Sequence, residues 1–312
     1  MVLVLALLAA SVAPAWAADP VAVLTEIRPG KGEVRVKTGN DTEWKAPAPL
    51  LSLRPGDQVR ATEDGRAVIL FSGGRPPQTV QASNSPFKVS APAGASAGTK
   101  AQELASGVTS FLFGKQDKPA YVSAYVPLST RSIRLPPLLI SPRKTKLLDT
   151  PVVFEWSGPE SQRYGVRVFG PDNAIMWEQT GLQRKDLPYP ASSPSLKPGV
   201  RYAWELHAER SPVQRADFEL LPAADVSRVK ADLAALPTSG ASATTGSLMR
   251  ASYLFKEGCY LDARRELLAA IAADPNEASL HQLLSHVYAA MELKDLALDS
   301  FDEARYLSAP RP

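Results

Sequence analysis

The 312-residue chain has a single cysteine, Cys259, and only three histidines. One cysteine cannot form an internal disulfide, and His207, His281 and His286 are too few and too scattered to predict a metal site. The last two are five residues apart, a spacing that does not stack side chains on one face of a helix. We therefore expect no disulfide framework, no metal centre and no cofactor.

Catalytic motifs and charged runs are also missing. The sequence contains no Gly-rich phosphate loop, no Gly-x-Ser-x-Gly and no His-Glu-x-x-His, and no histidine or acid pair stands beside Cys259 to activate it. The 35 basic and 32 acidic residues nearly balance, and no five like charges follow one another. The sequence thus predicts no catalytic residue, no enzyme and no nucleic-acid partner.

Long apolar runs are absent apart from the start of the chain. Residues 2–10 are apolar but too few to span a bilayer, and Ala15-Trp16-Ala17 places small residues at the two cleavage positions. Residues 1–17 are therefore predicted to be a signal peptide, cut before Ala18. We expect a periplasmic or secreted bacterial protein that is soluble after cleavage and has no integral membrane segment.

Residues 20–92 carry short strand patterns separated by tight turns. Glu33 to Lys37 alternates polar and apolar side chains, residues 67–71 are apolar throughout, and Pro55-Gly56 predicts a turn between strands. We expect Asp57, which follows this turn, to cap it by binding backbone groups.

The order of residues in this region resembles the FecR-type domain, a small β-rich periplasmic module. The resemblance rests on Gly32-Glu33-Val34, Trp44, Leu53, Gly56-Asp57, Val59-Arg60, Gly65-Arg66-Ala67 and Phe71. It implies a β-rich unit over residues 20–92, and a signalling role in those members of the family that regulate transcription.

Two further segments are predicted to connect larger units. Residues 93–140 are assigned as a linker of uncertain role, with a short helix pattern over Glu103 to Lys115. Residues 222–246 carry a short amphipathic helix over 225–236 and then a Ser/Thr/Gly/Ala-rich linker. Ser247 is the predicted N-cap of the helices that follow.

Residues 141–221 form a second strand-rich region, with turn signals at intervals of about ten residues, which predicts a β-sandwich. The segments 151–156, 164–168 and 196–204 resemble fibronectin-III or immunoglobulin-like modules of exported proteins. Their aromatic residues either fill the core or form a platform that stacks on carbohydrate. We expect Trp156, Tyr202 and Trp204 in the core, and Trp177, next to a turn, to be the exposed ring that would stack on a ligand.

Residues 247–310 contain a helical pattern that repeats after 34 residues. The matching pairs are Ala263 and Ala297, Leu267 and Phe301, and Ala270 and Ala304, so that 297 − 263 = 34. This pattern resembles two tetratricopeptide (TPR) repeats, in which small residues let paired helices approach closely. Because a free array needs about three units, we expect the helix at 225–236, a neighbouring domain or another protomer to cover them.

The TPR resemblance implies a concave groove on the first helix of each unit, which would bind a protein or peptide partner. The predicted partner-binding residues are Arg250, Tyr253, Glu257, His281 and Tyr288. The alternative is that these helices only pack on the β units.

The sequence as a whole predicts a multidomain β + α protein, with two small all-β modules followed by an α-helical pair of TPR-like hairpins. We expect a non-enzymatic exported adaptor or scaffold that binds a protein partner or an envelope component such as a polysaccharide. Two alternatives stay open: a periplasmic signalling regulator of the FecR type, and a cell-envelope glycan-binding protein.

Overall fold

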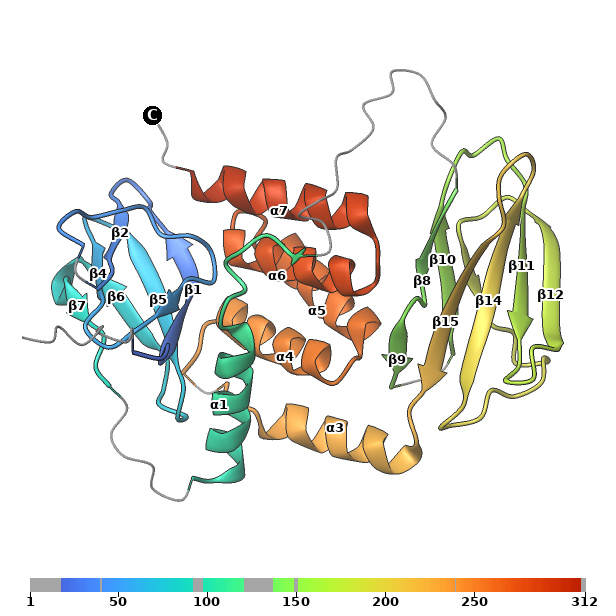
Figure 1. The fold of residues 1–312 in the computed structure, drawn as a ribbon, viewed down its shortest axis with the longest axis horizontal. Coiled ribbons are helices and arrows are strands. Elements are labelled where there is room, and N and C mark those ends of the chain that lie inside the picture. The colour runs from blue at the N-terminus through green and yellow to red at the C-terminus, as the bar shows by residue number, and fades with distance from the viewer. Residues whose placement is uncertain are drawn as a thin grey trace, which may run out of the picture.

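The computed structural model describes residues 18–39, 41–91, 98–120, 137–148, 151–238 and 240–309. The predicted signal peptide, residues 1–17, lies outside these ranges, as do residue 310 and parts of the predicted linker 93–140. Strands dominate the chain up to Leu220 and helices end it, which confirms the β-then-α layout. Figure 1 shows the C-terminal helices between two β-rich units rather than beyond them.

The N-terminal β unit consists of two sheets, ordered β3-β1-β5-β6 and β2-β4-β7. Its strands are β1 (Ala22–Arg28), β2 (Val34–Lys37), β3 (Ser52–Leu53), β4 (Gln58–Ala61), β5 (Arg66–Phe71), β6 (Gln78–Gln81) and β7 (Phe87–Lys88), with a 3-10 turn at Ala82–Asn84. Strands β1 and β5 are buried on both faces. Leu24 and Ile69 pack with the second sheet, whereas Val23 and Leu70 belong to the core of the helices. This double burial explains why residues 67–71 are apolar throughout.

Asp57 has the turn-capping role that the sequence predicts. Its buried carboxylate accepts hydrogen bonds from the backbone N–H groups of Gly39 and Arg54, each at 2.8 Å. Gly56, in the same turn, has φ +96°, a conformation that favours glycine. The Gly56-Asp57 pair is therefore explained by the turn.

The second β unit is a sandwich of two sheets, ordered β13-β10-β8 and β12-β11-β14-β15-β9. Its strands are β8 (Leu138–Ser141), β9 (Thr145–Leu147), β10 (Val153–Ser157), β11 (Tyr164–Phe169), β12 (Ile175–Leu182), β13 (Asp186–Pro188), β14 (Arg201–Ala208) and β15 (Gln214–Leu220). The first strand begins at Leu138, three residues before the predicted boundary. Trp156, Tyr202 and Trp204 are buried in the core, as expected, and Trp204 Nε1 donates to the Pro142 carbonyl at 2.7 Å.

The C-terminal helices are α4 (Ala243–Lys256), α5 (Tyr260–Ala273), α6 (Ala278–Ala290) and α7 (Lys294–Ser308). The turn between α4 and α5 is repeated between α6 and α7. The N–H of Cys259 donates to Leu254 O and that of Leu293 donates to Tyr288 O, both at 2.9 Å, and 293 − 259 = 34. None of the helices in the described ranges combines the length and apolar character that crossing a membrane requires.

Two helices from the predicted connecting segments complete this helical array. Helix α1 (Lys100–Leu112) packs on α4, β1 and β5, and α3 (Ala223–Ala235) packs on α1 and α4. Ala105, Val108 and Leu112 of α1 are buried in the same core as α4 to α7. The cover expected for two repeats is therefore supplied within the chain, and the described part of 93–140 is not only a linker.

Helix α4 begins earlier than the sequence predicts. The Ser242 hydroxyl accepts the N–H of Thr245 at 3.0 Å, which makes Ser242 the N-cap. The predicted cap at Ser247 is wrong, because that residue lies inside the helix and its hydroxyl accepts from Arg250 instead.

Candidate functional site on the inner face of the helices

Three of the predicted partner-binding residues lie on α4 or at its C-cap and are engaged within the chain. Tyr253 is 2% exposed, and its hydroxyl donates to Asp232 of α3 at 2.7 Å. Glu257 accepts from Arg228 of α3 at 2.8 Å. Arg250 Nε donates to Glu266 of α5 at 2.9 Å. Tyr253 and Glu257 thus contribute polar contacts between α3 and the C-terminal end of α4.

The two predicted residues on α6 contact other parts of the chain. His281 Nε2 lies 3.0 Å from the Pro275 carbonyl. Tyr288 is 7% exposed, and its hydroxyl accepts from Arg264, which also pairs with Glu155 of the sandwich at 2.8 Å. None of these contacts joins the α6 residues to the other three, and each of the five residues instead contacts another segment of the chain.

Trp177, the residue expected to stack on a ligand, is only partly exposed. Its ring lies parallel to Phe154, with centroids 6.4 Å apart, and meets the edge of Tyr189 at 5.6 Å. Both neighbours belong to the sandwich core. Trp177 therefore extends that core at its margin.

The inner face of the helices, defined here as the sides of α4 and α6 that meet β1 and residues 113–118, carries a cluster of polar contacts. Gln282 Nε2 donates to the carbonyls of Lys115 at 2.7 Å and Asp117 at 3.1 Å. His286 Nε2 lies 2.9 Å from the same Lys115 carbonyl. Because a carbonyl only accepts, this contact requires the proton on Nε2. Burial lowers the pKa of His286 to about 4, so the ring is neutral at pH 7.

Residues 113–118 are also held from the opposite side. The Gly114 N–H donates to the Ser52 hydroxyl at 3.0 Å, and that hydroxyl donates to Gln116 at 3.1 Å. The Lys115 ammonium lies 4.8 Å from the centre of the Phe111 ring, and burial lowers its pKa. The inner face therefore holds a turn segment of its own chain, largely through backbone carbonyls.

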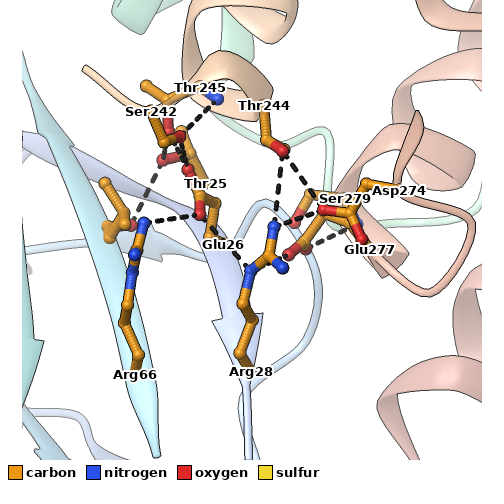
Figure 2. A network of polar contacts seen from close by, with 11 residues as sticks. Thr25, Glu26, Arg28, Arg66, Ser242, Thr244, Thr245, Asp274, Glu277 and Ser279 are labelled. Atoms are coloured by element: carbon orange, nitrogen blue, oxygen red, sulfur yellow. Dashed lines mark hydrogen bonds and ion pairs between the residues drawn. The ribbon is translucent and has the colours of Figure 1, made fainter. Parts of the chain in front are cut away.

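A second polar cluster lies at the N-termini of α4 and α6, where they meet β1 (Figure 2). Glu26 of β1 accepts hydrogen bonds from Ser242 and Thr245 at the start of α4, the latter at 2.6 Å. Glu277 is the N-cap of α6 and accepts the N–H of Ser279 at 3.3 Å. Two helix N-termini, which favour negative charge, thus converge on two buried carboxyl groups.

Two arginines join this cluster, which we call the β1–helix joint. Arg28 lies 3.6 Å from Glu26 and 3.7 Å from Glu277, and it also pairs with Asp274. Arg66 of β5 lies 3.3 Å from Glu26. Although burial lowers the pKa of Arg28, its three acidic neighbours raise it on balance.

Sequence patterns did not predict either cluster as a unit, although the TPR resemblance places His286 on or near the helices expected to line the groove. The available signal was polar side chains inside buried segments: Thr25 and Glu26 interrupt an apolar strand, and Gln282 lies on a buried helix face. Such residues need partners when they are buried, but their partners are remote in sequence.

The described residues offer little for catalysis. They contain no group of three or more His, Cys, Asp or Glu side chains placed to hold a metal ion. Cys259 is fully buried, and burial raises the pKa of its thiol to about 12, so the nucleophilic thiolate does not form at neutral pH. A hollow of about 130 Å³ between the sandwich and the turn at Gly258 carries both signs of charge, including Lys146, Arg201 and Asp217.

Comparison with known proteins gives no family assignment: no protein-family model matches the chain, and no curated protein matches it significantly. Its own structure defines a β-then-α protein in which a helical array joins two β-rich units.

Proposed function

We propose that this chain is an exported, non-enzymatic adaptor, in which the helical array both holds two β units in place and binds a protein partner. The observation that carries the proposal is the 34-residue duplication of the helix–turn–helix unit, down to the hydrogen bonds of its turn. A repeat of this period and shape supports the TPR-like assignment, and such arrays serve chiefly as binding surfaces.

The two β units support the same proposal. A sandwich whose antiparallel sheets enclose aromatic residues is the architecture of immunoglobulin-like and fibronectin-III-like modules. The double-sheet N-terminal unit is compatible with the FecR-like assignment. Modules of these kinds, with no catalytic cluster in the described residues, fit a scaffold better than an enzyme.

One exposed surface of the array lies on α7, whereas the inner face is filled by the chain itself. Tyr306 is 77% exposed, and Asp299, Asp302 and Glu303 lie one turn or two before it on the same side of the helix. Burial and repulsion from neighbouring aspartates raise the pKa of Asp299. A partner segment with Lys or Arg beside an apolar anchor would complement this face.

The test compares the full chain with Tyr306→Ala and Asp302→Asn in capture from envelope extracts. We expect each variant to lose most of a partner that the unchanged chain retains, and salt to weaken capture because exposed charges are screened. Ile175→Ala, at an exposed apolar residue of the sandwich, is the matched control. If all four proteins capture the same set, partner binding by α7 is wrong.

Point variants are preferable to deleting residues 247–312. That deletion would expose Val23 and Leu70 of the β unit, which belong to the core shared with the helices. Loss of capture would then report unfolding rather than loss of a binding face. Glycan binding gains no support from Trp177, because its ring is only partly exposed and packs against Phe154 and Tyr189 of the sandwich core.

A further inference from the structure

The β1–helix joint contains two carboxyl groups with no exposure to solvent. Glu26 comes from the N-terminal β unit and Glu277 from the helices, and both side chains are 0% exposed. Burying a charge without a matching counter-charge is costly. The charge balance at this joint therefore affects how firmly the two units hold together.

Three carboxyl groups face two guanidinium groups in this joint. Arg28 is shared among Glu26, Asp274 and Glu277, and Arg66 contacts Glu26. Figure 2 shows Arg28 between the carboxyl groups of β1 and those of the α5–α6 turn. With every carboxyl ionised, one negative charge is left over, and a single bound proton removes it.

The surplus charge falls on Glu277. Its Oε2 makes no hydrogen bond within the described part of the chain and lies 3.7 Å from Arg28 Nε. Burial and the nearby Glu26 raise the pKa of Glu277 to about 8, although Arg28 and the backbone amides of Ser279 and Ile27 oppose the shift. The α4 side chains at the joint, Ser242, Thr244 and Thr245, carry no charge that could compensate.

We propose that Glu277 is a proton-operated latch: its neutral carboxyl group lets the β1–helix joint close, and its ionisation loosens the joint. Folded protein with a raised carboxyl pKa binds more protons than the unfolded chain. The stabilisation is therefore complete below the ordinary glutamate pKa of 4.5, declines as the pH rises and is lost once the pH passes about 8. This inference does not depend on the proposed adaptor role.

The test uses the full chain and Glu277→Gln, whose amide keeps the shape of the protonated acid and cannot ionise. Hydrogen exchange of β1 and of the first turn of α6 is compared at about pH 5.5 and about pH 8.5 after correction for intrinsic rates. We expect protection in the unchanged chain to fall by about tenfold or more with rising pH, and protection in the variant to stay level.

Glu33→Gln is the matched control, because Glu33 also pairs with two arginines, at 2.8 and 2.9 Å, but at a more exposed position. Its pH dependence should follow that of the unchanged chain. The proposal is wrong if protection falls equally with rising pH in Glu277→Gln and in the unchanged chain. It is also wrong if protection in Glu33→Gln does not change with pH.

Infrared spectroscopy of the unmodified chain keeps the proposal testable if Glu277→Gln does not fold. A buried protonated carboxyl group has a carbonyl band distinct from that of a carboxylate. We expect this band at about pH 6 and its loss by about pH 9.5. A native chain without the band at about pH 6 contradicts the proposal.

Discussion

At the scale of single residues, buried polar groups find partners that are remote in the sequence. Thr25 lies 3.1 Å from Thr245, which is 220 positions away, and Gln282 donates to a carbonyl 167 positions away. An unpaired polar group in the interior costs free energy, so each of these contacts helps to select one arrangement of the units. The sequence shows which residues are polar, but it does not show which group, remote in the sequence, each of them will contact.

Gln282→Ala tests how much the hydrogen bonds between the inner face and residues 113–118 stabilise the fold. The change removes the donor to the carbonyls of Lys115 and Asp117, and leaves His286 as the remaining α6 side-chain contact of the Lys115 carbonyl. We expect the free energy of unfolding in urea to fall by about 1–3 kcal/mol. Gln179→Ala, at an exposed residue of β12, should change it by less than about 0.5 kcal/mol. Equal changes in the free energy of unfolding for the two substitutions would show that the Gln282 hydrogen bonds do not stabilise the fold.

At the scale of elements, local patterns predicted most of the strands and the repeat. The apolar run 67–71 became β5, and the 34-residue period became two helix pairs with matching turns. Helix α1 shows what such local patterns do not predict, which is where an element packs. A short helix was predicted inside a linker, but its docking on α4 depends on contacts between segments far apart in the chain. The residues predicted to line a groove contact α3, α5 and the Pro275 turn. The amphipathic pattern of a helix predicts that one face is buried, but it does not predict which element packs against that face.

The turn that recurs after 34 residues gives a prediction for the element scale. Gly258 has φ +83° and Glu292, at the equivalent position, has φ +57°. A side chain in this left-handed conformation costs about 1 kcal/mol relative to glycine. Gly258→Ala should therefore lower the free energy of unfolding by about 1 kcal/mol, although its new methyl group would meet only ordinary contacts with Lys146.

Gly107→Ala is expected to change the free energy of unfolding in the opposite direction. Gly107 lies inside α1, and there alanine is favoured over glycine by up to about 1 kcal/mol. Its new methyl group would approach only the flexible end of Lys256. Thermal melts of the two variants should shift in opposite directions, and a shift in the same direction would show that the backbone conformation of Gly258 is not the controlling factor.

At the scale of the whole molecule, the described residues pack into cores that do not coincide with the units of the sequence. One core joins Val23, Leu50 and Leu70 of the N-terminal unit to helices α1 and α3 to α7. The sandwich has its own core, to which the helices contribute Leu261. The N-terminal unit and the helices should therefore unfold together, while the sandwich is linked to them by fewer contacts, such as the Arg264–Glu155 pair.

Paired core truncations test this division. Leu248→Ala in α4 and Phe154→Ala in β10 each remove a fully buried side chain, and each should cost about 2–5 kcal/mol where it acts. If the helices and the N-terminal unit share one core, Leu248→Ala should lower hydrogen-exchange protection in β1 and β5 as well as in α4, and leave β14 little changed. Phe154→Ala should lower protection in β14 and leave β1, β5 and α4 little changed, because the Phe154 ring packs on Trp204 and Phe218 within the sandwich.

If Leu248→Ala lowers protection in the helices alone, then β1 and β5 are stable without the helices. The helical array would then be a docked attachment rather than part of one folding unit with the N-terminal strands.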